Sequence, residues 1–78
     1  MGYTVYVLKN LKGELYIGQT KNIDDRIARH NSGRSLSTKN KGPYALIHKE
    51  EYGTRAEAIK REKELKSGQG RKWIKENF

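Results

Sequence analysis

The sequence contains no cysteine and one proline, and only 33% of its 78 residues are hydrophobic. Without cysteine the chain has no disulfide framework, no thiolate-bound zinc and no thiol nucleophile. A chain this short buries only about 60% of the surface that its unfolded form exposes, so it supports one small core. We therefore expect a single domain over residues 1–78, and an enzyme built around a large organic cofactor is disfavoured.

Long hydrophobic runs are absent as well. The first residues, Met1 to Tyr6, have no basic lead and no continuous apolar stretch, which argues against a secretory signal peptide. No segment approaches the roughly 20 apolar residues that a membrane-spanning helix needs. We therefore expect a cytoplasmic protein.

Acidic residues are scarce and unevenly placed. The chain has 17 Lys and Arg residues against 9 Asp and Glu residues, a net charge of +8, and no acid lies between Asp25 and Glu50. One interpretation is a solvated surface that keeps a small protein in solution. We favour a site for a polyanion, which is most often nucleic acid. Acidic and basic residues that are interspersed over a surface rarely leave so long a stretch without an acid. The candidate nucleic-acid contacts are Arg26, Arg29, Arg34, Lys39, Lys41, Lys66, Arg71 and Lys72.

Residue patterning predicts an α+β fold. Strands are expected over 3–8, 14–18 and 45–52, with a hairpin turn at 10–13 and a loop over 32–43. Helices are expected from the Asn22 cap to about residue 31, and from the Thr54-x-x-Glu57 capping box to Lys66. Residues 67–70 should end that helix, and 71–75 could add a short helical turn. The order β-β-α-β-α predicts a small three-stranded antiparallel sheet flanked by helices.

Polar side chains fall where apolar ones are expected on both helices. Glu62 lies within the apolar arc of the second helix, where a carboxylate is costly unless it is paired, protonated or bound to a cation. An ordinary ion pair with Lys66, four residues on, is the structural alternative. On the first helix, Arg26 and His30 are also four residues apart. They could face one ligand, or they could be a snorkelling arginine and a partly exposed cation at the helix end.

Two tyrosines occupy the middle of the predicted hairpin strands. A bulged loop of odd length would place Tyr6 and Tyr16 on the same face of the hairpin. Taken singly, each is more typical of a core aromatic with a hydrogen-bonded hydroxyl than of a catalytic group. Their combination with Arg26, His30 and Glu62 is more informative.

With these residues the sequence resembles the GIY-YIG nuclease superfamily. The second signature tripeptide is intact as Tyr16-Ile17-Gly18, and Tyr6 of Thr4-Val5-Tyr6 stands at the position of the first, which keeps only its tyrosine. The resemblance covers nearly the whole chain. It is nearest to compact stand-alone bacterial members, which resemble the nuclease module of the bacterial excision-repair incision protein. The remaining matches follow in order, as Gln19-Thr20, Ile23, Arg26, His30-Asn31, Gly33, Ala58, Glu62 and Leu65-Lys66.

The resemblance implies divalent-metal-dependent cleavage of a DNA phosphodiester. It makes Glu62 the ligand of Mg²⁺ or Mn²⁺, Arg26 a contact to the scissile phosphate, and Tyr6, Tyr16 and His30 the other polar members of the site. One carboxylate, phosphate oxygens and waters suit such a cation. Tyr6 is the candidate base if Arg26 and the metal lower its pKa. Tyr16 would then orient water or phosphate, and His30 would accept the Tyr6 proton or contact phosphate.

Other functions fit the same residues. A catalytically inactive module with this fold would bind nucleic acid through its charge alone, and a protein-interaction domain with a basic surface is a weaker alternative. Family members that cut at defined sites usually carry a separate DNA-binding domain, for which this chain has no room. An enzyme of this size would therefore read DNA structure or depend on a protein partner for targeting, in DNA repair or recombination.

Overall fold

The computed structural model describes residues 2–31 and 43–78, which form a three-stranded antiparallel sheet with three helices. The strands lie in the order β2-β1-β3, so β1 is central. The predicted α+β class is confirmed. Within the described ranges, no helix is long and apolar enough to span a membrane. The elements are β1 (Tyr3–Asn10), β2 (Leu15–Thr20), α1 (Ile23–Asn31), β3 (Tyr44–Tyr52), α2 (Arg55–Lys66) and α3 (Gly68–Asn77).

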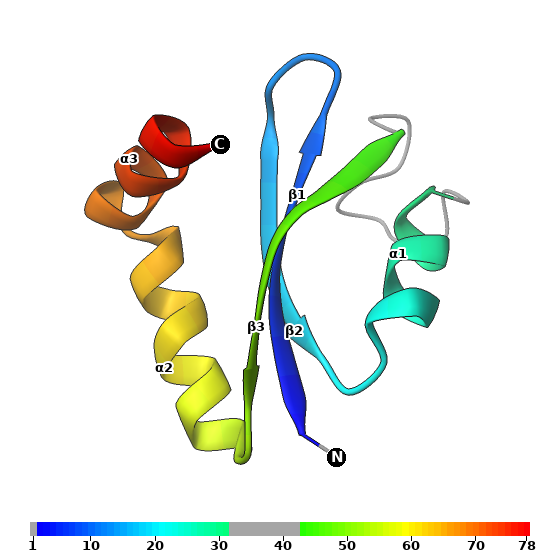
Figure 1. Ribbon diagram of the computed structural model, residues 1–78, viewed down its shortest axis with the longest axis vertical. Coiled ribbons are helices and arrows are strands. Elements are labelled where there is room, and N and C mark those ends of the chain that lie inside the picture. The colour runs from blue at the N-terminus through cyan, green and yellow to red at the C-terminus, as the bar shows by residue number, and fades with distance from the viewer. Residues whose placement is uncertain (1, 32–42) are drawn as a thin grey trace.

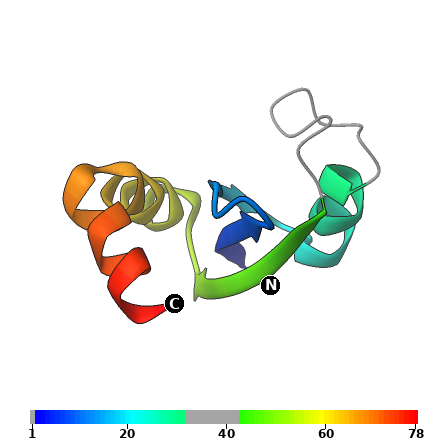
Figure 2. The ribbon, with the colours of Figure 1, turned by 90° about the horizontal axis from the view of Figure 1, so that it is seen from above.

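The sheet is covered on both faces, with α1 on one side and α2 and α3 on the other (Figures 1 and 2). Side chains alternate along a strand, so β1 supplies residues to both layers. Val5 and Val7 pack towards α2 and α3, whereas Tyr6 and Leu8 pack towards α1. All four are fully buried. A continuous buried run in β1 thus reflects a strand with no solvent-facing side.

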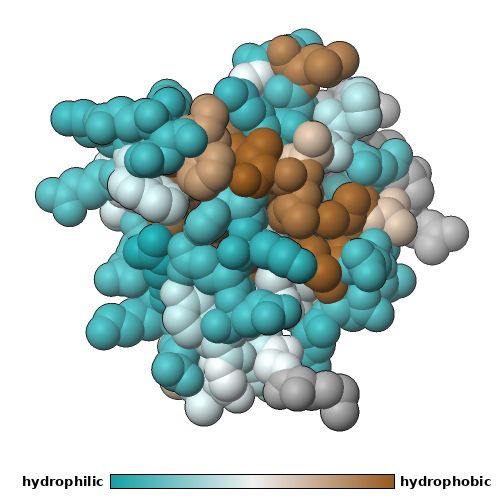
Figure 3. Space-filling model, in the orientation of Figure 1, coloured by the Kyte–Doolittle hydropathy of each residue, from teal (hydrophilic) through white to brown (hydrophobic). Residues whose placement is uncertain are grey.

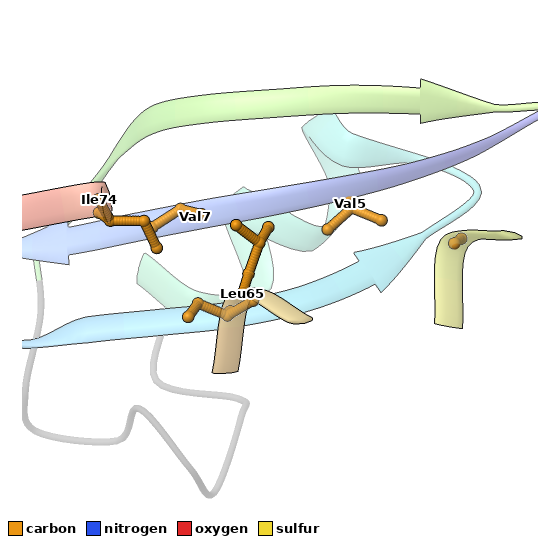
Figure 4. Close-up of a cluster of buried hydrophobic side chains, with 6 residues drawn as sticks. Val5, Val7, Leu65 and Ile74 are labelled. Carbon is orange, nitrogen blue, oxygen red and sulfur yellow. The ribbon is translucent and has the colours of Figure 1, made fainter. Parts of the chain in front are cut away.

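The larger core lies between the sheet and the C-terminal helices. Leu65 near the end of α2 and Ile74 in α3 meet Val5 and Val7 of β1 (Figure 4). Leu65 and Ile74 are each 1% exposed, so one buried side chain near each helix end anchors this layer. Ile74 therefore closes this layer, whereas Trp73 beside it is 39% exposed.

The hairpin between β1 and β2 is held by Asn10 and Gly13. The Asn10 Oδ1 atom accepts hydrogen bonds from the backbone N–H groups of Lys12 and Glu14, at 3.1 and 2.8 Å. Gly13 has φ +83°, a left-handed conformation that glycine adopts without steric cost. The predicted bulged turn is confirmed, although β1 extends two residues beyond the predicted end at Leu8.

Side-chain caps set the helix boundaries. The Asn22 Oδ1 atom accepts from the Asp25 N–H at 3.1 Å, and the Thr54 hydroxyl accepts from the Glu57 N–H at 3.3 Å, as predicted. The prediction for 67–75 was wrong in extent. Ser67 alone separates the last two helices, because it ends α2 and also caps α3, which runs from Gly68 to Asn77.

Gly70 is where α3 passes closest to α2. A Cβ atom added there would lie 2.1 Å from the Glu64 carbonyl oxygen and 2.6 Å from the Leu65 Cα atom, whereas one added at Gly68 would meet nothing within 4 Å. The two glycines lie in the same helical turn, and only Gly70 has this contact. They form a matched pair for testing the packing of α2 on α3.

We expect Gly70→Ala to lower the free energy of unfolding by about 1–3 kcal/mol, the usual cost of overpacking, because backbone atoms must separate. Gly68→Ala should leave stability unchanged or slightly higher, since alanine favours a helix. Urea denaturation followed by circular dichroism measures both. Equal midpoints for the two variants would contradict this account of the α2–α3 contact.

A partly buried ion pair joins β3 to α2 on the same side of the sheet. Arg61 donates two hydrogen bonds to the Glu50 carboxylate, at 2.8 and 3.1 Å, and His48 and Tyr52 also contact that carboxylate. Burial alone would raise the pKa of Glu50. The hydrogen bonds from Arg61, His48 and Tyr52 outweigh burial and lower this pKa to about 2, from its usual value of 4.5.

This pKa predicts an acid-sensitive part of the stability. Because the folded protein binds the Glu50 proton more weakly than the unfolded chain, the contribution is complete above pH 4.5 and is lost as the pH falls towards 2. Unfolding free energies measured across that range should fall in the native protein and fall less steeply in Glu50→Gln. Parallel curves for the two proteins would contradict the assignment.

Candidate active site

Tyr6 and Tyr16 lie on the same face of the sheet, as predicted. In the register of the hairpin, Tyr6 is opposite Gly18 and Tyr16 is opposite Leu8. The two tyrosine rings are stacked with centroids 6.2 Å apart. Tyr6 is fully buried and Tyr16 is partly exposed, so Tyr16 forms the outer of the two rings.

Gly18 makes room for the Tyr6 hydroxyl. A Cβ atom at this position would lie 2.7 Å from the Tyr6 hydroxyl oxygen and 3.3 Å from a carbon of the Tyr16 ring. Such contacts are shorter than van der Waals separation, so only a glycine on β2 lets Tyr6 lie across its neighbouring strand. The glycine of the Tyr16-Ile17-Gly18 tripeptide therefore has a direct steric role at the site.

His30 reaches the same hydroxyl from α1. Its Nε2 atom lies 3.2 Å from the Tyr6 hydroxyl oxygen, and its ring centroid is 4.5 Å from that of Tyr16. The side chain is 2% exposed. Burial, followed by the charges of Arg26 and Arg29, lowers the pKa of His30, so the imidazole is neutral at pH 7. The alternative of a partly exposed cation at the helix end is wrong.

The environment of Tyr6 keeps its hydroxyl protonated. Burial, reinforced by Tyr16, raises the pKa of Tyr6 to about 12, although the charge of Arg26 and its hydrogen bond to the phenol act in the opposite direction. Arg26 therefore lies beside the hydroxyl and favours its ionisation, as expected. The effect of Arg26 alone does not lower the pKa of Tyr6, because burial dominates.

Glu62 lies on α2 with its side chain 20% exposed. Lys66 donates to its Oε2 atom at 2.6 Å, so the ion pair expected from the helical spacing is present. Its other oxygen, Oε1, accepts no hydrogen bond from the described residues. The charge of Glu62 also acts on Tyr6, where it raises the pKa. The Glu62 carboxylate thus forms a structural ion pair, and its charge also acts on the Tyr6 hydroxyl.

The donor set around Glu62 fits one hard cation held by few protein ligands. Within residues 2–31 and 43–78, no group of three or more His, Cys, Asp or Glu side chains could hold a metal together. A site of this kind has a single carboxylate and leaves the remaining positions to water and substrate oxygens, an arrangement that Mg²⁺ accepts and Zn²⁺ generally does not.

An open groove of about 350 Å³ extends from Arg26. Lys21, which follows β2, and Arg55, which begins α2, add two further cations to its lining. Arg55 and Glu62 are seven residues apart, so they share one face of the helix. Sequence reasoning missed Lys21 and Arg55 because both stand near acids in the chain. Only the tertiary fold brings them beside Arg26.

Asn31 fixes the end of α1 to the start of β3. Its side-chain amide donates to the Tyr44 carbonyl oxygen at 3.1 Å and accepts from the Tyr44 N–H at 2.7 Å. Tyr44 is 6% exposed, and its ring lies 6.4 Å from that of His30. Asn31 follows His30 directly, so this two-point contact also limits how far the histidine can move.

The candidate nucleic-acid contacts are only partly brought together. Arg26 belongs to the Tyr6 site, and Arg29 is exposed on the same helix. Lys66 is engaged with Glu62, while Arg71 and Lys72 lie on α3, on the other side of the sheet. The predicted loop contacts Arg34, Lys39 and Lys41 lie outside the described residues.

Comparison with known proteins agrees with this geometry. The GIY-YIG catalytic domain family matches residues 2–77. The UPF0213 protein SSP2268 of Staphylococcus saprophyticus is 39% identical over 72 residues, which cover 91% of this chain and 88% of that protein.

Two solution structures share the fold. The UPF0213 protein BH0048 of Bacillus halodurans superimposes with a TM-score of 0.59 and 31% identity, over 95% of this chain and 82% of that one. Protein EF2693 of E. faecalis gives a TM-score of 0.62 and 32% identity, over 96% and 84% of the two chains. The chain belongs to the GIY-YIG catalytic domain family. It is also similar to proteins described as UPF0213.

The contact between Gly18 and Tyr6 predicts the effect of a single methyl group. Gly18→Ala should displace the Tyr6 ring and lower the free energy of unfolding by about 1–3 kcal/mol. With its hydrogen-bond partner moved and water admitted, the pKa of His30 should rise towards 6.5, its ordinary value. An NMR titration of His30 measures this change.

Gly53→Ala is the matched control, because a Cβ atom there meets nothing within 4 Å. That variant should leave the His30 titration where it is in the native protein. A Gly18→Ala protein with an unchanged His30 titration would show that the methyl group does not move Tyr6.

Proposed function

We propose that this protein is a metal-dependent DNA endonuclease that hydrolyses a phosphodiester bond. The observation that carries the proposal is the meeting of three polar side chains in the buried layer under α1. The Tyr6 hydroxyl contacts both the neutral imidazole of His30 and the guanidinium of Arg26, and Glu62 acts on the same hydroxyl through its charge. Membership of a catalytic domain family supports a chemical role for this cluster.

Arg26 is the proposed phosphate ligand. A guanidinium offers two parallel N–H donors to nonbridging oxygens, and negative charge grows on these oxygens during hydrolysis. Lys21 and Arg55 continue the positive lining of the groove away from Arg26. We infer that the DNA backbone follows this groove, so that the phosphate held by Arg26 is the one that is cut.

Glu62 is the proposed ligand of Mg²⁺ or Mn²⁺, through the oxygen that Lys66 does not engage. The chemistry supplied by such an ion is stabilisation of negative charge on the phosphate and leaving oxygens. Lys66 holds the carboxylate in position on its other side. The two sequence interpretations of Glu62, an ion pair with Lys66 and a metal ligand, are therefore compatible. One carboxylate oxygen forms the ion pair, and the second oxygen is left for a cation.

Tyr6 and His30 form the proposed proton path. A phenol with a pKa of about 12 does not act as a free phenolate at pH 7. Instead, the Tyr6 oxygen takes a proton from the attacking water while its own proton passes to Nε2 of His30, 3.2 Å away. The resulting hydroxide attacks phosphorus. Arg26 is hydrogen-bonded to the hydroxyl in the free protein, so its turning towards phosphate would free the Tyr6 oxygen for the water, which Tyr16 would orient.

Residues 1–78 would act as one nuclease domain on DNA of defined structure, or with weak sequence specificity. The likeness to the excision-repair nuclease module suggests a role in DNA repair or recombination, with a protein partner supplying targeting. A cytoplasmic location suits that role.

Nicking of supercoiled plasmid tests the proposal. With Mg²⁺ or Mn²⁺ the protein should nick the plasmid, and removal of the metal by EDTA should stop the reaction. Glu62→Gln should abolish nicking, because the amide keeps the shape of the side chain and loses its charge. Tyr6→Phe should lower the rate by about 10²- to 10⁴-fold, the usual contribution of a proton-transferring group.

Glu64→Gln is the matched control for Glu62→Gln. It lies on the same helix, its side chain is 55% exposed, and its ion pair with Arg61 is long, at 3.8 Å. This variant should nick like the native protein. Equal nicking by all variants would identify a contaminating nuclease. Salt-sensitive DNA binding without cleavage of plasmid, flapped or branched DNA would favour the inactive binding module instead.

A further inference from the structure

A second group of aromatic side chains lies on the opposite side of the sheet from Tyr6. Trp73 and Phe78, at the C-terminal end of the described chain, are 39% and 47% exposed, whereas Ile74 between them is 1% exposed. The core is therefore closed by Ile74 and does not need the two rings. Figure 3 shows hydrophobic residues in a band that crosses β3 from the end of α3. The exposed rings thus require another explanation.

The rings are held in fixed relative positions. Trp73 meets Phe78 edge to face at 5.8 Å and meets His48 of β3 in the same way at 5.4 Å. The Arg61 guanidinium lies 5.6 Å from the Trp73 ring centroid. Because Glu50 holds Arg61 by two hydrogen bonds, this cation cannot easily leave the ring. The aromatic cluster is therefore preorganised, so that binding to it costs little further entropy.

A hollow of about 540 Å³ adjoins this surface. Trp73 forms part of its wall, with Arg61 and Lys63 as cations, Glu64 as an acid, and Ser67 and Gln69 as hydrogen-bonding groups. Further cations, Arg71, Lys72 and Lys75, belong to the same helix as Trp73, where Glu76 is the only acid. The hollow thus combines an aromatic wall with polar groups and two cations.

We propose that this surface, made by Trp73, Phe78, Arg61 and Lys63, binds an unpaired nucleic-acid strand. A base stacks on an aromatic ring irrespective of its sequence, and neighbouring cations attract the phosphates. The polar groups of the hollow suit the edges of a base. Bases of a duplex are stacked on one another and offer no free face, so the strand must be unpaired. This inference goes beyond the proposed nuclease and requires no cleavage.

Trp73 is the only tryptophan of the chain, so its fluorescence reports directly on the proposed site. Short oligothymidylate and oligouridylate serve as probes, with EDTA present to prevent hydrolysis. Each strand that binds should quench the fluorescence in a saturable manner, and the affinity should fall as salt rises. A duplex of mixed sequence should cause much less quenching at the same phosphate concentration. The probe that binds tighter identifies the kind of strand.

Variants connect the signal to the surface, with affinity measured by anisotropy of a labelled probe. Trp73→Ala should weaken binding about tenfold, since stacking on one base contributes a factor of this order. Trp73→Phe should retain most of the affinity because it keeps an aromatic face. Phe78→Ala provides a second truncation if Trp73→Ala fails to fold. Leu11→Ala is the matched control, because Leu11 is 91% exposed on the hairpin turn and does not line the hollow.

Three results would overturn the proposal. They are single-strand binding that leaves the fluorescence unchanged, equal quenching by duplex, and full affinity in both truncations. Its failure is distinguishable from failure of the nuclease. Plasmid nicking without quenching of Trp73 fluorescence would support the nuclease and reject the single-strand site. Quenching by a protein that does not nick plasmid would support the single-strand site and reject the nuclease.

Discussion

The buried hydroxyl of Tyr6 is the constraint on which the site depends. A polar group at the centre of a small sheet is costly unless it is hydrogen-bonded, and β1 cannot turn it towards water because both faces of the strand are covered. Gly18 gives it space, His30 meets it from α1, and Arg26 lies beside it. The same contacts that satisfy the hydroxyl assemble a phenol, an imidazole and a guanidinium. Stability and chemistry therefore share one set of interactions.

The central strand also divides the molecule into two chemically different halves. On the α1 side, burial determines the protonation states, since it raises the pKa of Tyr6 and lowers that of His30. On the α2 and α3 side, hydrogen bonds outweigh burial and keep Glu50 ionised. The first side suits proton transfer between neutral groups. The second has fixed charges and open aromatic rings, which suit binding. The two faces of one three-stranded sheet therefore carry both kinds of surface.

Local rules predicted most of the fold. The β-branched and aromatic runs, the Thr54 capping box and the left-handed Gly13 each act within a few residues, so the sequence shows them directly. Residues 68–70 were the exception. Glycines usually end a helix, but here the Ser67 hydroxyl caps a new helix by accepting from the Gly70 N–H. The close approach of Gly70 to Glu64 and Leu65 depends on packing of α3 on α2. The shared face of Tyr6 and Tyr16 was predictable from strand register. The burial of His30 and the grouping of Lys21 with Arg55 depend on distant elements.

The contact of Asn31 with Tyr44 separates the geometry of the site from the segment that connects α1 to β3. Asn31 and Tyr44, which flank residues 32–42 in the chain, are held together by two hydrogen bonds. Changes of sequence between these two residues should therefore leave His30 and the first residues of β3 in place. Connections of this kind are where related proteins usually diverge in function. Asn31 thus makes the segment a suitable position for grafting a recognition element of a different specificity onto an unchanged scaffold.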